Sequence, residues 1–149
     1  MSQAAVPNRN SWAEAVKELM LRHDAFSKLL GLQVEEVGPG YCWLRFTVRP
    51  DMLNGFRVLH GGVTFSAADS AFAFACNSHS RQSVGLSATM GYVAAGQLGD
   101  VITVEAREES LKHKIGVYQL CVTNQHGTLL AMFKGTAYRT SHEILPAPL

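Results

Sequence analysis

The segment from Leu53 to Ser78 contains the residue types and spacing that could carry out chemistry. Asn54-Gly55 predicts a turn, and His60-Gly61-Gly62 is a second point of flexible backbone. From Val63 onward, a run of small and apolar residues predicts a buried helix. The first N–H groups of a helix lack helical partners and lie at the positive end of its dipole. The start of this helix could therefore bind an oxyanion or a polarised carbonyl.

Asp69 lies two turns into the predicted helix. Its neighbours in the sequence are apolar: Ala67, Ala68, Ala71, Phe72 and Ala73. An ionised carboxylate in such surroundings loses hydration, so its pKa rises unless partners are supplied. Asp69 could instead face solvent or bond Ser66 or Ser70, while His60 alone could be structural and the glycines could form only a tight loop. We interpret the combination of a donor-rich helix start and a carboxylate two turns along as a candidate catalytic site.

Length and composition limit the possible classes of protein. The 149 residues predict a single domain over 1–149, and the low charged fraction of 17% favours surface hidden in an oligomer. A net charge of +1 argues against a nucleic-acid partner. Three scattered cysteines favour a reducing cytoplasm over a disulfide framework. No signal peptide is expected from the polar start, and the fourteen residues 63–76 are too few to span a membrane.

The remaining sequence predicts the elements around this segment. One helix is expected from Ser11, with a capping box to Glu14, to a stop at Gly31, and Arg22–Asp24 form its solvated face. Residues 32–48 alternate as a strand or hairpin around Gly38-Pro39-Gly40. Later strands are expected at 83–93, 101–107, 115–123 and 128–138, and residues 1–10 and 141–149 are expected to be loose. The expected class is α+β, with one antiparallel sheet of about five strands around the apolar helix.

These motifs together resemble a known family. Asn54-Gly55, His60-Gly61-Gly62 and Asp69, followed by Ala71-Phe72 and Cys76-Asn77, resemble the hotdog-fold acyl-CoA thioesterases, in particular the PaaI type of phenylacetate degradation. The resemblance covers residues 30–138. It implies a curved antiparallel sheet around a long central helix. It also implies a homodimer or homotetramer whose active sites lie between protomers, with Asn54 from one chain and Asp69 from its partner.

The resemblance also implies roles for individual residues. The substrate would be a (hydroxy)phenylacetyl-CoA-like or other small to medium acyl-CoA, with Asp69 as the general base for water or as a transient nucleophile. Gly61 would donate its N–H to the thioester oxygen, and Gly62 would also contact the substrate. Asn54 would position the water or carbonyl, His60 would shape the loop, and Ser87 would orient the acid or simply face the helix. Four basic residues could contact the coenzyme A phosphates or be merely solvated: Lys112, Lys114, Lys134 and Arg139. No cofactor and no metal are expected.

Two features distinguish this chain within the resemblance. Ala94-Ala95 stands where many relatives carry Arg-Pro, which removes one expected contact to coenzyme A. Phe74 stands where related hydratases carry a histidine, so a hydratase fits less well than a thioesterase. A non-catalytic acyl-CoA-binding module remains an alternative. The acyl group is left open, because core packing explains the phenylalanines of the central segment as well as an aryl substrate does.

Overall fold

The computed structural model describes residues 9–146. Its α-helices are α1 (Arg9–Leu21), α2 (Ala25–Leu30) and α3 (Gly61–Asn77), and a short 3-10 helix, η1, covers Pro50–Met52. The strands are β1 (Gln33–Gly38), β2 (Tyr41–Thr47), β3 (Arg81–Tyr92), β4 (Val101–Leu111), β5 (Ile115–Thr123) and β6 (Leu129–Glu143). Within residues 9–146, no helix combines the length and apolarity needed to cross a membrane.

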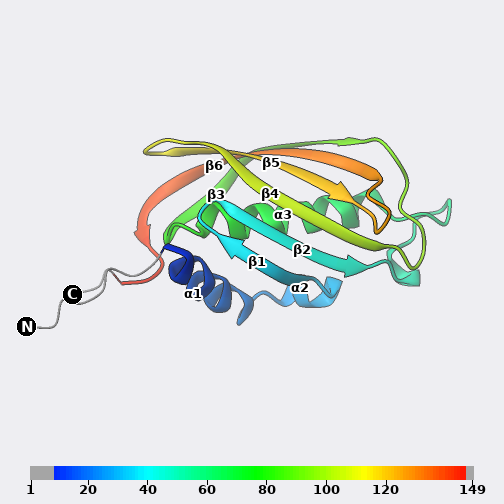
Figure 1. Ribbon diagram of the computed structural model, residues 1–149, viewed down its shortest axis with the longest axis horizontal. Helices are drawn as coiled ribbons and strands as arrows, with labels where there is room; N and C mark the ends of the chain where they lie inside the picture. Colours follow the sequence, from blue (N-terminus) through cyan, green and yellow to red (C-terminus); the bar gives the residue numbers. More distant parts are fainter. Residues whose placement is uncertain (1–8, 147–149) are drawn as a thin grey trace, which may run out of the picture.

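All six strands belong to one antiparallel sheet, in the order β1-β2-β4-β5-β6-β3. The sheet curves around α3, while α1 and α2 lie beside β1 (Figure 1). The expected curved antiparallel sheet around a central helix is confirmed. It has six strands because the turn at Gly38-Pro39-Gly40, with Gly40 at φ 69°, separates β1 from β2. The two edge strands are β1 and β3.

The inner face of the sheet follows from alternation in the sequence, because successive strand side chains point to opposite faces. Every second residue of the central strands is fully or almost fully buried: Cys42, Leu44 and Phe46 in β2, Ile102, Val104 and Ala106 in β4, and Tyr118, Leu120 and Val122 in β5. These side chains form the surface on which α3 packs. Burial of such side chains against one helix supplies most of the hydrophobic stabilisation of the fold.

Small residues allow α3 to lie close to the sheet. Ala67, Ala71 and Ala75 are fully buried. The ring of Phe72 lies under Gly135, where an added Cβ would come within 2.9 Å of it. This close packing fixes the rotation of α3 about its axis. It therefore determines which side chains of the helix remain uncovered.

The N-terminal region differs from the sequence prediction. A single helix ending at Gly31 was expected, but Arg22–Asp24 separate α1 from α2. Asp24 is the N-cap of α2 and not part of a solvated helix face, because its carboxylate accepts from the N–H and hydroxyl of Ser27 at 2.9 and 2.6 Å. The predicted stop at Gly31 is confirmed by its left-handed φ of 68°.

Regular structure also extends further than expected at both ends of the described region. The α1 helix begins at Arg9, so Ser11 lies inside the helix and the predicted capping box is wrong. Strand β6 continues to Glu143, so residues 141–143 are not loose. The expectation of loose residues at 1–8 and 147–149 falls outside the described residues.

Candidate active site

The loop before α3 is shaped by Asn54. Its side-chain Oδ1 accepts from the N–H groups of Phe56 and Val58 at 2.9 and 3.3 Å, and its own N–H donates to the Val58 carbonyl at 2.8 Å. Asn54 Nδ2 donates to no group among residues 9–146. This leaves one side-chain N–H pair, held at a fixed place by the loop, to bind a substrate carbonyl or a water.

His60 is the N-cap of α3. Its Nδ1 accepts from the Gly62 N–H at 2.8 Å, so a neutral His60 carries its proton on Nε2. The Gly62 amide, which was expected to contact the substrate, is occupied by this bond. The Gly61 N–H, in contrast, has no acceptor in the described part of the chain. It is therefore the free donor at the positive end of the α3 dipole, as the sequence predicted.

Tyr92, at the end of β3, was missed by the sequence reasoning. Its hydroxyl donates to the Gly61 carbonyl at 3.0 Å, and its ring lies 3.2 Å from the position of a Cβ at Gly61. The contact joins residues 31 positions apart. No local pattern in the sequence could have indicated it. Tyr92 thus holds the carbonyl end of Gly61, in the peptide unit that follows the candidate oxyanion donor.

Asp69 is exposed in the single chain, and the expectation of a buried carboxylate was wrong in this respect. Four of its apolar neighbours, Ala67, Ala68, Ala71 and Phe72, are buried, whereas Asp69 lies on the uncovered side of α3. The uncovered face of the helix runs along positions three or four apart: Gly62, Ser66, Asp69 and Ala73. Partial burial still raises the pKa of the Asp69 carboxyl above its ordinary value.

The alternative of local hydrogen bonds to Asp69 is not supported. The Ser66 hydroxyl donates to the Gly62 carbonyl at 2.8 Å, and the Ser70 hydroxyl lies 3.2 Å from that of Ser27. Asp69 forms no hydrogen bond or ion pair with another described residue. A carboxylate with a raised pKa and unused lone pairs is a stronger base than an ordinary surface aspartate.

Asp69 lines a small cavity of about 210 Å³ together with Ser87. The other walls are Phe72, Gly85, Leu86 and Ala88. Ser87 and the Asp69 carboxylate thus border the same cavity, and the role expected for Ser87 stays a prediction. Gly61, Asn54 and His60 do not line this cavity. Gly61 and Asp69 are eight positions apart on the helix, which corresponds to about 12 Å along the axis.

The four basic residues predicted to contact coenzyme A do not form one group. Arg139 lies beside the β4–β5 hairpin, where its N–H donates to the Lys114 carbonyl at 2.8 Å and its Nη1 to the Lys112 carbonyl at 3.0 Å. Arg139 also borders a cavity at the C-terminal end of α3, about 25 Å from Gly61 along the helix. Lys134 is exposed on β6, between β3 and β5.

No cluster of three or more His, Cys, Asp or Glu side chains that could hold a metal ion occurs between residues 9 and 146.

Comparisons with known proteins give the family. The family model of the thioesterase superfamily matches residues 56–131. The acyl-coenzyme A thioesterase PaaI of Escherichia coli is 34% identical over 132 residues, covering 89% of this chain and 93% of the relative. The medium/long-chain acyl-CoA thioesterase YigI of Salmonella typhimurium is 32% identical over 75 residues, about half of each chain (49% and 48%).

The fold matches a solved relative over almost its whole length. The structure of the E. coli PaaI protein, from the phenylacetic acid degradation operon, superposes with a TM-score of 0.90 and 33% identity, covering 93% of this chain and 100% of that chain. The fold and the resemblance expected from the sequence are confirmed. This chain belongs to the thioesterase superfamily and has its hotdog fold.

Proposed function

We propose that this protein hydrolyses acyl-CoA thioesters to a free acid and coenzyme A. The observation that carries the proposal is a pair of unsatisfied groups on α3: the Gly61 N–H at its start, and the Asp69 carboxylate with a raised pKa. The Gly61 N–H can stabilise a developing oxyanion, and the Asp69 carboxylate can accept a proton from water. The similarity to a relative named as an acyl-CoA thioesterase supports this choice of substrate class.

The proposed reaction is direct attack by water. Asp69 takes a proton from the water as its oxygen bonds to the thioester carbonyl carbon, and the Gly61 N–H stabilises the negative charge that forms on the carbonyl oxygen. Asn54 Nδ2 positions the carbonyl, and Ser87 orients the Asp69 carboxylate or the water. The tetrahedral intermediate then breaks its carbon–sulfur bond and releases coenzyme A. The proposal assigns no step to a metal or cofactor.

One chain alone does not complete this site. A general base must lie within hydrogen-bond reach of the attacking water, but Asp69 is about 12 Å along the helix from Gly61. We therefore assign Asn54 and Gly61 of one protomer and Asp69 and Ser87 of its partner to each active site. A second copy placed against the uncovered face of α3 would bring the two halves together.

The β3 edge supports such an assembly. It is a twelve-residue edge strand paired only with β6, and it exposes Val84 and Leu86 by 48% and 58%. A long apolar edge strand with unpaired backbone groups favours pairing with another strand. Two β3 strands related by a two-fold axis would pair antiparallel and make a self-complementary interface. This dimer could assemble further into a tetramer.

The walls of the Asp69 cavity favour an apolar acyl group. Phe72 and Leu86 provide apolar surface beside the carboxylate, and Gly85 leaves space between them. A phenylacetyl or hydroxyphenylacetyl group fits this chemistry. Phe74 is buried in the core and does not line this cavity, so it makes no acyl contact there. A phenylalanine also cannot supply the acid–base group of a hydratase.

The proposal is tested with a panel of aryl- and alkyl-CoA thioesters, in which release of free thiol is followed with a chromogenic thiol reagent. We expect turnover, with aryl-acetyl thioesters giving the highest kcat/KM. Saturable binding of these thioesters without thiol release, by protein shown to be folded, would contradict the proposal and favour the non-catalytic binding module.

A further inference from the structure

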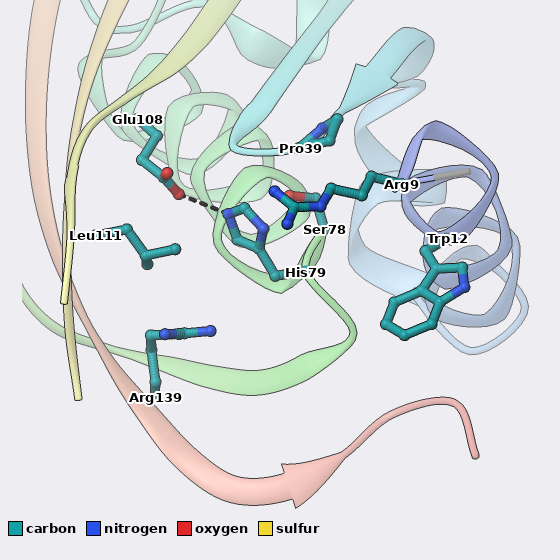
Figure 2. A pocket seen from close by; sticks show the side chains of 8 residues that line it. All are labelled: Arg9, Trp12, Pro39, Ser78, His79, Glu108, Leu111 and Arg139. Atoms are coloured by element: carbon teal, nitrogen blue, oxygen red, sulfur yellow. Dashed lines mark hydrogen bonds and ion pairs between the residues drawn. The ribbon is translucent and has the colours of Figure 1, made fainter. Parts of the chain in front are cut away.

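A cavity of about 490 Å³ lies at the C-terminal end of α3, remote from the Asp69 cavity. It is formed where α1, the turn before β2, the end of α3, β4 and β6 meet. The walls combine two guanidinium groups, Arg9 and Arg139, with the imidazole of His79 and the apolar surfaces of Trp12 and Leu111 (Figure 2). Its volume lies within the range of sites for small organic ligands, which is roughly 300–1,000 Å³.

The acidic side chain in this cavity is already paired. Glu108 Oε2 lies 2.7 Å from His79 Nε2 and accepts from the Tyr118 hydroxyl, also at 2.7 Å. Burial, and then the hydrogen bond to Glu108, raise the pKa of Tyr118, which keeps this hydroxyl protonated as a donor. Both contacts fall on Oε2, so this oxygen of the carboxylate is engaged within the protein. The side of the imidazole that carries Nδ1 remains free of partners among the described residues.

The two arginines, in contrast, have unused donors. Among residues 9–146, Arg139 Nε is buried without a hydrogen-bond partner, and the bonds of its guanidinium run from Nη1 to the backbone of the β4–β5 hairpin. Arg9 forms no ion pair with any described residue. Figure 2 shows both guanidinium groups directed toward the cavity from different elements. A buried donor without a partner, such as Arg139 Nε, is unfavourable. Arg9 is exposed, and an anion in the cavity would receive charge-assisted hydrogen bonds from both guanidinium groups.

We infer that this cavity is a second ligand site, which binds a small organic anion: a carboxylate or phosphate ester attached to an apolar or aromatic body. The oxyanion lies between Arg9 and Arg139, and the body packs on Trp12 and Leu111. Arginine suits this role because its planar group donates two parallel hydrogen bonds to a carboxylate or phosphate.

The same cavity is not a second hydrolytic site. Ser78 lies next to His79 in its wall, but the Ser78 hydroxyl donates to the Ala75 carbonyl at 2.7 Å and accepts from the Gly40 N–H at 2.7 Å. This serine therefore closes the end of α3 and is not bonded to His79. The site binds a ligand, and nothing in it activates a nucleophile.

The fluorescence of Trp12 tests the inference independently of turnover. In a Trp43→Phe background, Trp12 is the only tryptophan of the chain. The protein is titrated separately with inorganic phosphate, phenylacetate and adenosine 3′,5′-bisphosphate. We expect a saturable change with at least one organic anion. Arg9→Gln and Arg139→Gln should each raise its Kd about tenfold or more, since each removes a charge-assisted contact. The matched control, Lys28→Gln on the exposed side of α2, should leave Kd unchanged.

The three probes separate the sources of the anion. Binding of phenylacetate identifies a released carboxylic acid as the type of ligand, whereas binding of the bisphosphate identifies a phosphate ester such as the nucleotide part of a thioester. No saturable change with any probe would overturn the inference, and so would an unaltered Kd in Arg9→Gln. That variant decides the question if Arg139→Gln disturbs folding, because Arg139 also supports the hairpin and Arg9 does not.

Discussion

Replacing Asp69 by asparagine is the most direct test of the proposed chemistry. Asparagine keeps the size of the side chain and its hydrogen-bonding capacity, but it cannot accept a proton from water. The Asp69 carboxylate has no partner among the described residues, so the change breaks no intramolecular contact. Any loss of activity therefore reports on the reaction itself and not on a damaged structure.

A positioned general base contributes about 10²–10⁴ in rate. We expect kcat of Asp69→Asn to fall by this factor, which corresponds to about 2.7–5.4 kcal/mol of activation free energy. Thiol release from an acyl-CoA thioester measures kcat, and thermal melting of the same preparation measures stability. Glu109→Gln, an exposed acid on β4, is the matched control and should keep wild-type kcat.

The pH dependence gives a second readout. Burial raises the pKa of Asp69 above 3.8, and the base must be ionised to act. The wild-type kcat/KM should therefore rise with pH through this raised pKa, and Asp69→Asn should lose that dependence. Because the pKa of Asp69 is higher in the folded than in the unfolded state, ionisation of Asp69 lowers the free energy of unfolding. This loss of stability appears as pH rises through the unfolded-state pKa and then the folded-state pKa. Asp69→Asn should accordingly melt at the same or a slightly higher temperature at pH 7, and the difference should vanish below pH 3.8.

Wild-type turnover in a folded Asp69→Asn protein would refute the role of Asp69 as base, whatever the pH profile. The structure shows no contact that this change would break, so the melting temperature should not fall. A variant that loses activity and also melts at a much lower temperature would therefore indicate a structural role for Asp69 instead.

Three further predictions concern the donor, the assembly and the core. Gly61→Val should lower kcat about a hundredfold or more, the value of one oxyanion donor, because its Cβ would lie 3.2 Å from the Tyr92 ring and displace the peptide; unchanged kcat would contradict the assignment. Wild-type protein should show no monomer by light scattering at micromolar concentration, whereas Leu86→Lys on the β3 edge should be monomeric and inactive; an active monomer would disprove the shared site. Gly135→Ala should lower the free energy of unfolding by about 1–3 kcal/mol, measured in urea, because its Cβ would lie 2.9 Å from Phe72; Gly85→Ala, at an ordinary 3.4 Å from Phe72, is the control.

Local pattern in the sequence determined most of the elements. The alternation in residues 115–123 gave β5 with its observed bounds, because the pleat of a strand places every second side chain on the same face. The helix start at His60-Gly61-Gly62 was also readable, since an unpaired first turn is a property of any helix. The break between α1 and α2 was harder to predict, because an Asp24 within a charged run can be either a surface residue of one long helix or the N-cap of a second helix. The bond that makes it a cap, to Ser27, is visible only in three dimensions.

Tertiary structure decided how the predicted site residues are arranged. The apolar neighbours of Asp69 indicated a buried position, but the packing of Phe72 under Gly135 sets the rotation of α3 and turns Asp69 to the uncovered side. The order of strands places β3 at an edge beside β6, away from β2 and β4, which precede and follow it among the strands of the chain. This position places Ser87 at the Asp69 cavity and brings Tyr92 to Gly61. The separation of Gly61 from Asp69 in one chain also follows from the rigid helix between them. Such relations join residues distant in sequence, and they depend on how the sheet closes around the helix, which no local periodicity encodes.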